Sequence, residues 1–338
     1  MARKRPSTGQ VIGGIVAGFD QQVFRTTPPA EELVAKGKRL APVPAAGGGT
    51  LTVGLVEELD AQPADDAEPA TFHLDAPDAH AIVDLAHGGR LSSFVVGGRE
   101  LLVTEGFGSF GWGSFPMAPF AGRVRHGRFT FRGDRHQLAI EMPPHAIHGT
   151  VLRRAWHRLD ERTISTELGP GWPFAGRAVQ RFELRDGRFD FRLEVHADEP
   201  MPASIGWHPW FLRQPTAVDR ATSGPPTPPV ELDLDACSMY RRDADGITTA
   251  DRIAPVPGPW DDCFTDLRRP PVLRWPGFLE LTIESSCREW VVYTVPTEAL
   301  CVEPQTAPPD ALNLGPAIVE PGRPLIAEMT WSWRSLAS

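Results

Sequence analysis

The chain has 338 residues, 41% of them hydrophobic and 23% charged, which is typical of a globular protein with a sizeable core. Its formal net charge of −9 disfavours nucleic acid and anionic membrane as partners, since both require a basic surface. The 4 cysteines lack CxxC spacing, so we expect free thiols in a cytoplasmic protein rather than disulfides or structural zinc. No apolar run reaches the roughly 18 residues that a membrane span needs.

Two regions follow one another along the chain. Residues 1–70 are rich in Pro, Gly and Ala and keep no hydrophobic period, which predicts a flexible N-terminal extension. The pattern changes near residue 71, where short stretches of alternating polar and apolar residues begin. We therefore expect residues 71–338 to form a single domain.

Alternation with period 2 indicates β-strands in this second region. The segment RFDFRLEVH at residues 188–196 alternates strictly, and residues 279–284 and 328–333 do the same. Asp186 and Gly187 precede the first of these segments and predict a hairpin. No long stretch keeps a period of 3.6. The sequence thus predicts an all-β fold, an antiparallel β-sandwich or barrel with few short helices.

Residues 214–230 and 241–260 differ from their surroundings in composition. Both are rich in Pro, Asp and Thr, and they are predicted to interrupt the strands as long loops. Loops of that length in a compact domain tend to be functional or mobile.

The first candidate functional residues are an arginine and two histidines. Arg123 follows prolines and glycines at residues 113–122, and its planar guanidinium suits bidentate hydrogen bonds to hydroxyls or anions; a surface arginine after a turn is the alternative. His145 and His148 have a spacing that would suit a metal only on a helix. Gly149 and the preceding prolines oppose a helix, so we expect hydrogen-bonding or structural histidines and no metal.

The later candidates are a histidine and several carboxylates. In IGWHPWF, Pro209 restricts His208 to extended conformations, and the aromatic neighbours offer surfaces that stack on sugars or fill a core. Asp261 and Asp262 indicate an acidic turn or a binding group. Glu303, within CVEPQT, is poorly suited to the surface and is expected at a pocket with a raised pKa. A histidine and a carboxylate facing each other across a cleft suffice for general acid–base catalysis.

Taken together, five segments resemble those of the aldose 1-epimerase (mutarotase) family. They are FPMAPFAGR (115–123), similar to (Y/F)PLxPFxGR; HAIHG (145–149), similar to HxxHG; GWHPWF (206–211), similar to GxHP(Y/F)F; DDCF (261–264), similar to DxxF; and CVEPQT (301–306), similar to (C/V)xEPQT. They occur in the family's order, and the resemblance covers about three quarters of the chain.

The resemblance implies a galactose mutarotase-like β-supersandwich that interconverts the α and β anomers of a free aldose such as glucose or galactose. It is an isomerase reaction that needs no cofactor and no metal, and the monosaccharide is the implied partner. Glu303 matches the family's base and His208 its acid. The implied sugar-binding residues are Arg123, His148, Asp261, Trp210 and Gln305. Trp210 stands where Tyr is more usual, and Asp262 remains an alternative to Asp261.

Other functions remain open at this point. A hexose-6-phosphate 1-epimerase on the same fold would need cations for the phosphate, which Arg125, Arg153 and Arg154 could supply. A non-catalytic carbohydrate-binding or sensing module would need no matched acid and base. A glycosidase is disfavoured because it uses two carboxylates, whereas the best pair here is one carboxylate and one imidazole.

Overall fold

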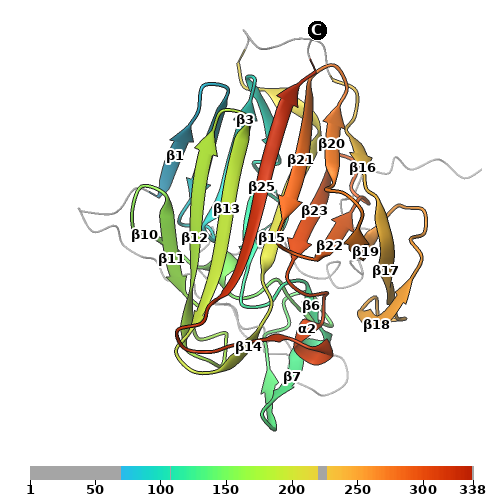
Figure 1. Cartoon of the computed structure of the whole chain (residues 1–338). Helices are drawn as coiled ribbons and strands as arrows, with labels where there is room; N and C mark the ends of the chain where they lie inside the picture. Colours follow the sequence, from blue (N-terminus) through green and yellow to red (C-terminus); the bar gives the residue numbers. More distant parts are fainter. Residues whose placement is uncertain (1–69, 107, 220–226, 337–338) are drawn as a thin grey trace, which may run out of the picture. The chain divides into compact units, whose positions relative to one another are not determined.

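The computed structural model describes residues 70–106, 108–219 and 227–336. The extension predicted for residues 1–70 lies outside these ranges, apart from Ala70. Two antiparallel sheets dominate the described part, and Figure 1 shows the smaller sheet, which contains β25 (Leu325–Ser335), in front of the larger one. The predicted all-β, antiparallel sandwich class is confirmed.

The larger sheet has 11 strands. In spatial order they are β1 (Thr71–Asp75), β2 (Ala79–Asp84), β3 (Arg90–Val96), β4 (Arg99–Leu102), β15 (Gly206–Ala217), β23 (Ala299–Gln305), β22 (Glu289–Tyr293), β19 (Asp261–Leu267), β17 (Ala236–Arg242) and β18 (Thr248–Ile253). The remaining strand, β5 (Ser114–Met117), pairs with both β15 and β3. This sheet therefore joins segments that are far apart in the sequence.

The smaller sheet has 8 strands. In spatial order they are β10 (His157–Arg158), β11 (Thr163–Glu167), β12 (Gly176–Arg185), β13 (Arg188–Ala197), β25, β21 (Leu279–Ser285), β20 (Val272–Trp275) and β16 (Glu231–Asp233). Three two-stranded sheets pair β14 (Met201–Ala203) with β24 (Ala317–Val319), β6 (Arg123–Val124) with β9 (Ala146–Ile147), and β7 (Arg128–Phe131) with β8 (Asp134–Gln137).

Helices are short, as the absence of a 3.6-residue period predicted. Within the described ranges they are the 3-10 turns η2 (Arg125–Gly127) and η3 (Val151–Arg153) and the single-turn helix α2 (Ala311–Leu314). None of the helices in the described residues is long and apolar enough to cross a membrane. All four cysteines are free thiols, which confirms the expectation from their spacing.

The hairpin predicted at Asp186 and Gly187 is confirmed. β12 and β13 pair in register up to the Arg185–Arg188 pair, which leaves these two residues as the turn. Along β13 the side chains alternate between buried and half-buried positions, as the period-2 pattern predicts. Its apolar side chains thereby face the larger sheet.

The core between the two sheets is aromatic. Phe94 of β3 contacts Phe189 of β13 with ring centroids 5.5 Å apart, and it lies 5.4 Å from Trp331 of β25. Phe211 of β15 lies 5.0 Å from the same Trp331 ring. Burying such rings is worth about 1.5–3 kcal/mol each, so the two sheets are held together chiefly by this layer. The opposite face of the larger sheet is left to build a site.

Two loop predictions were wrong in part. Residues 214–230 were expected to be loop, but β15 continues to Ala217. Residues 241–260 were also expected to be loop, but β18 (Thr248–Ile253) pairs with β17 within that range. β18 is the last strand of its sheet and several of its side chains are exposed, so a polar composition there is compatible with a strand.

Candidate active site

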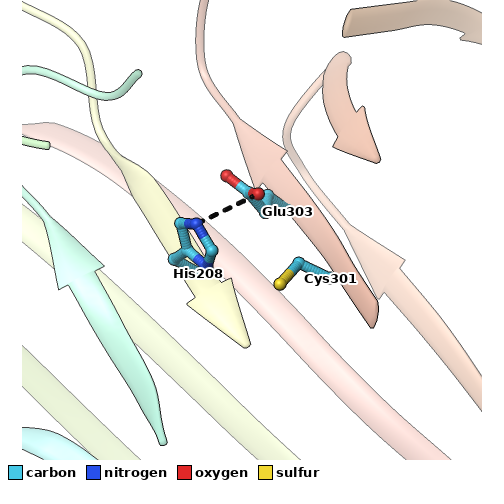
Figure 2. Close-up of side chains that lie close together, drawn as sticks. All are labelled: His208, Cys301 and Glu303. Atoms are coloured by element: carbon cyan, nitrogen blue, oxygen red, sulfur yellow. Dashed lines mark ion pairs between the residues drawn. The ribbon is translucent and has the colours of Figure 1, made fainter. Parts of the chain in front are cut away.

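Two neighbouring strands bring His208 and Glu303 together. β15 and β23 pair at Gly206–Gln305 and again at Trp210–Cys301, which sets His208 across from Glu303 on one face of the sheet. The His208 Nε2 atom lies 3.3 Å from Glu303 Oε1. Figure 2 shows the two side chains reaching toward each other from adjacent strands. The two segments that sequence reasoning treated separately thus form one site.

Gly206 allows the two backbones to approach closely at this point. A Cβ atom at position 206 would lie only 2.3 Å from the Pro304 carbonyl oxygen, a distance that no side chain tolerates. Pro209 and Pro304 lack the backbone N–H that a regular ladder uses, so the pairing is interrupted around the two functional side chains. The GxHP and EPQ patterns therefore describe a close, irregular junction between two inner strands.

Aromatic rings fix the orientation of the His208 imidazole. It stacks on Phe115 with centroids 4.8 Å apart and an interplanar angle of 22°, and on Trp210 at 5.3 Å and 16°. The predicted sugar-stacking residue Trp210 therefore packs on the histidine. The His148 ring meets His208 edge-on at 4.9 Å. With its ring held in this way, His208 has little rotational freedom.

His148 is held in an uncommon backbone conformation. Its φ is +60°, in the left-handed region that non-glycine residues seldom adopt. The next residue, Gly149, also has a positive φ, and a Cβ there would lie 2.0 Å from Ala118 O. The His148 N–H donates to Gly122 O at 2.9 Å, which anchors the turn. This tight turn points the imidazole toward His208.

Burial shifts both members of the pair toward their neutral forms. His208 is 6% exposed, and burial, followed by the charges of Arg90 and Arg123, lowers its pKa to about 3. Burial and the negative charge of Asp261 raise the pKa of Glu303 well above its usual value, against a smaller lowering by Arg123. At neutral pH His208 is therefore neutral, and burial also favours the protonated, neutral form of Glu303. An imidazolium beside a carboxylate, the state in which His208 would be the acid and Glu303 the base, is therefore not the resting state.

Charged side chains border this buried pair. Arg123 Nη1 lies 3.6 Å from Asp261 Oδ2, and both side chains are about one third exposed. Asp262 accepts a hydrogen bond from Arg242 Nε at 2.8 Å, and Arg242 Nη1 also lies 3.7 Å from Asp261 Oδ2. Of the two adjacent acids, Asp261 contacts Arg123 and contributes to the pKa of Glu303. The structure thus places Asp261 at the site and Asp262 beside it.

Buried polar atoms without partners gather at this site. In the part of the chain that the structure describes, ten buried side-chain atoms lack a hydrogen bond. Four of them belong to residues predicted from the sequence: His148 Nδ1, His208 Nδ1, Trp210 Nε1 and Gln305 Oε1. Gln305 also donates from Nε2 to Glu303 Oε2 at 3.3 Å. Buried polar groups normally have partners, so these atoms are available to hydrogen-bond a ligand or water at the site.

Arg90 is a residue that sequence reasoning missed. It is fully buried and donates hydrogen bonds to the carbonyls of His87 (2.7 Å), Ser109 (2.8 Å) and Trp112 (2.9 Å). Its guanidinium lies 4.1 Å from the Trp112 ring and 5.3 Å from Phe115, the ring that stacks on His208. Burial lowers the Arg90 pKa to about 10, so it stays charged at neutral pH. Its only signal in the sequence is an arginine directly after a double-glycine turn.

The structure also brings a third reactive side chain to the pair. Cys301 lies two residues before Glu303 on β23, and its Sγ lies with His208 Nε2 or Nδ1 and a Glu303 oxygen within 4.8 Å. Figure 2 shows its sulfur beside them. Sequence spacing indicated no metal-binding set, because this group combines residues from two strands about 90 positions apart. Spacing rules detect only ligands that are neighbours in the chain.

The fold and this junction define a galactose mutarotase-like β-supersandwich. A galactose mutarotase-like protein from Clostridium acetobutylicum matches with a TM-score of 0.66 at 13% identity, over 78% of this chain and 95% of its own. Galactose 1-epimerase from Lactobacillus acidophilus NCFM matches with a TM-score of 0.64 at 15% identity, over 81% and 97%. At these identities the likeness establishes the fold alone.

The family model described as aldose 1-epimerase matches residues 71–332, and the chain belongs to this family, whose members act on sugars. The uncharacterized protein YphB of Escherichia coli (strain K12) is 32% identical over 119 residues. That match spans 32% of this chain and 41% of YphB, so it covers less than half of that relative's length.

Proposed function

We propose that the protein is a mutarotase that interconverts the α and β anomers of a free aldose such as glucose or galactose. The observation that supports this most is the buried His208–Glu303 pair, whose facing atoms lie 3.3 Å apart and which is surrounded by unpartnered polar atoms. One proton on two facing groups supplies one acid and one base at the same time. Anomer interconversion needs these two groups and no bond to the protein.

The proton balance of the reaction follows from the pair. When sugar binds, its hydroxyls donate hydrogen bonds to Glu303 and stabilise the carboxylate. The proton of Glu303 then moves to His208 across their 3.3 Å contact. Glu303 then takes the proton of the O1 hydroxyl while His208 gives its proton to the ring oxygen O5. The C1–O5 bond breaks, an aldehyde forms, and the C1–C2 bond rotates. Closure runs the same transfers in reverse and yields the other anomer.

A free aldose fits this site better than a phosphorylated one. Arg125 pairs with Asp243 and with Asp245, the latter at 3.1 Å, and Arg153 pairs with Glu141. Two of the three arginines considered for a phosphate are thus already neutralised by carboxylates. A sugar phosphate would have to displace these ion pairs at a desolvation cost.

Polarimetry tests the proposal directly. Freshly dissolved α-D-glucose and α-D-galactose should reach their equilibrium rotation faster with the protein than without it, and α-D-glucose 6-phosphate should respond less. A protein that binds these sugars without accelerating any of them would be a binding module. Acceleration confined to the phosphate would identify the hexose-6-phosphate epimerase instead.

In the pH profile of kcat/KM, the histidine should control the acidic limb and the glutamate the alkaline limb, the reverse of the order that their ordinary pKa values give. Below the lowered pKa of His208, about 3, the pair gains a second proton and has no base, so kcat/KM falls toward acid. Above the raised pKa of Glu303 the pair loses its last proton and has no acid, so kcat/KM falls toward alkali. The ascending limb therefore belongs to the histidine and the descending limb to the glutamate. Metal-free protein should be used; an ascending limb near pH 6.5, the ordinary histidine value, would contradict burial as the controlling effect.

Arg123→Met should weaken sugar binding more than it slows the reaction. The guanidinium stands at the half-exposed border of the site beside Asp261 and is expected to hydrogen-bond sugar hydroxyls. Losing a charged hydrogen bond of about 1.5–3 kcal/mol should raise KM by roughly 10- to 100-fold. Initial-rate kinetics check this, with Arg274→Met as the control, since Arg274 is similarly exposed but lies on β20 of the smaller sheet and pairs with Glu280. A fall in kcat at constant KM would assign Arg123 to the transition state instead.

The activity is proposed to reside in residues 71–338. A chain that begins at residue 50 should keep its fold and its kcat/KM within about twofold, because the predicted extension contains none of the candidate residues. Circular dichroism and polarimetry on the shortened and full chains make the comparison. If the shortened chain folds normally but loses activity, the N-terminal region contributes to the site.

A further inference from the structure

Three side chains at the junction of β15 and β23 have the donor atoms of a zinc site. Cys301 and Glu303 are two residues apart on β23, so both project from the same face, and His208 lies across from Glu303 on β15. One ligand atom from each residue lies within 4.8 Å of the others. Figure 2 shows the sulfur, a ring nitrogen and the carboxylate around one small space.

The spacing agrees with tetrahedral zinc. Zinc binds imidazole nitrogen and carboxylate oxygen at about 2.0–2.2 Å, so two such ligands on a tetrahedron lie about 3.3–3.5 Å apart. The observed separation of His208 Nε2 and Glu303 Oε1 is 3.3 Å. The cysteine needs only a side-chain adjustment to complete three ligands, which leaves a fourth position for water.

The chemical types of the three ligand atoms indicate which metal ion this group would bind. Imidazole with thiolate favours zinc and similar borderline divalent ions, whereas magnesium and calcium require oxygen ligands. Cys301 faces Trp210 and Tyr293 on the two neighbouring strands, so the sulfur lies beside aromatic side chains. All three residues are buried, with exposed fractions of 6% for His208, 0% for Cys301 and 2% for Glu303. A cation held here is shielded from bulk water.

We propose that His208, Cys301 and Glu303 form an inhibitory zinc site, in which the cation competes with sugar for the acid–base pair. The part of this inference that concerns inhibition rests on the proposed mutarotase function. Zinc ligation occupies the lone pairs that would accept a proton from the sugar O1 hydroxyl, and it occupies the His208 nitrogen that would protonate O5. Zinc and reaction are therefore mutually exclusive, and removing the metal restores the enzyme.

Metal binding can be measured without any activity. Cobalt(II) added to the full-length, metal-free protein should produce a thiolate-to-cobalt absorption band in the near ultraviolet. Cys301→Val should abolish that band, since it replaces the sulfur by an apolar side chain with only one more heavy atom. Cys237→Ser, which alters the exposed cysteine, is the matched control and should keep the band.

Inhibition is the second measurement. Zinc should raise the apparent KM for α-D-galactose and leave kcat unchanged, and EDTA should reverse the effect. Cys301→Val should keep its metal-free activity while the zinc concentration for half inhibition rises at least about 100-fold. Equal zinc inhibition of the wild type and Cys301→Val would overturn the proposal.

The two inferences fail separately. A cobalt band that depends on Cys301 in a protein without epimerase activity would support the metal site and contradict the proposed function. Full epimerase activity without a cobalt band would contradict the metal site and leave the function standing.

Discussion

Replacing Glu303 by Gln, or His208 by Asn, is expected to lower kcat by about 100- to 10,000-fold, which corresponds to roughly 3–5 kcal/mol of transition-state stabilisation. Gln keeps the size of Glu, Asn is smaller than His but keeps a polar group at that position, and both amides still hydrogen-bond sugar in the ground state. Neither can exchange a proton with O1 or O5. KM should therefore change little, and polarimetric initial rates measure the loss.

The double variant sharpens this test. In the proposed mechanism Glu303 and His208 exchange one proton across their 3.3 Å contact, so removing either one should disable both. The double variant should therefore be scarcely slower than each single one, far from the product of the two losses. Near wild-type kcat for Glu303→Gln, in a folded protein that binds sugar, would remove the glutamate from the reaction.

Replacing Arg90 by Met should cause the largest loss of stability, about 3 kcal/mol or more in the free energy of unfolding. The substitution leaves three carbonyls, of His87, Ser109 and Trp112, without their charged donor inside the protein. Each such bond contributes about 1.5–3 kcal/mol, offset in part because burial of a guanidinium is itself costly. Urea unfolding of the variant measures the change.

A matched surface arginine provides the control. Arg334 is 67% exposed and pairs with Glu280 at 2.7 Å, so Arg334→Met should cost less than about 1 kcal/mol. Hydrogen exchange should also accelerate at residues 108–113 in Arg90→Met, because those carbonyls are released. Equal unfolding free energies for the two variants would show that the Arg90 bonds add nothing net.

The sheet architecture was predictable from the sequence where one face of a strand is buried. Residues 188–196 pack against the aromatic core on one side only, so polar and apolar residues must alternate along this segment. That alternation can be recognised in the sequence. β18 is an edge strand with little to bury, so its composition resembles that of a loop. Pairing order was not readable at all, since it depends on contacts between segments more than 100 residues apart, such as β4 with β15.

The residues of the candidate site were predictable from the sequence, but their protonation states were not. His208 and Glu303 stand in short patterns rich in Gly and Pro that resemble a family. Their protonation follows from burial and from the charges of Arg90, Arg123 and Asp261, which only the folded chain brings near. The pKa of a group depends on its surroundings in the folded chain. A sequence pattern that indicates the candidate reacting groups therefore does not predict which of them holds the proton.

His208 and Glu303 face each other across two inner strands, so the proposed catalysis depends on the register in which β15 and β23 pair. If β15 slid by one residue along β23, every side chain of β15 would turn to the opposite face, and the imidazole would enter the aromatic core. A shifted register therefore does not keep the two groups within reach of one sugar. We therefore expect the proposed activity only from molecules in which β15 and β23 pair in this register.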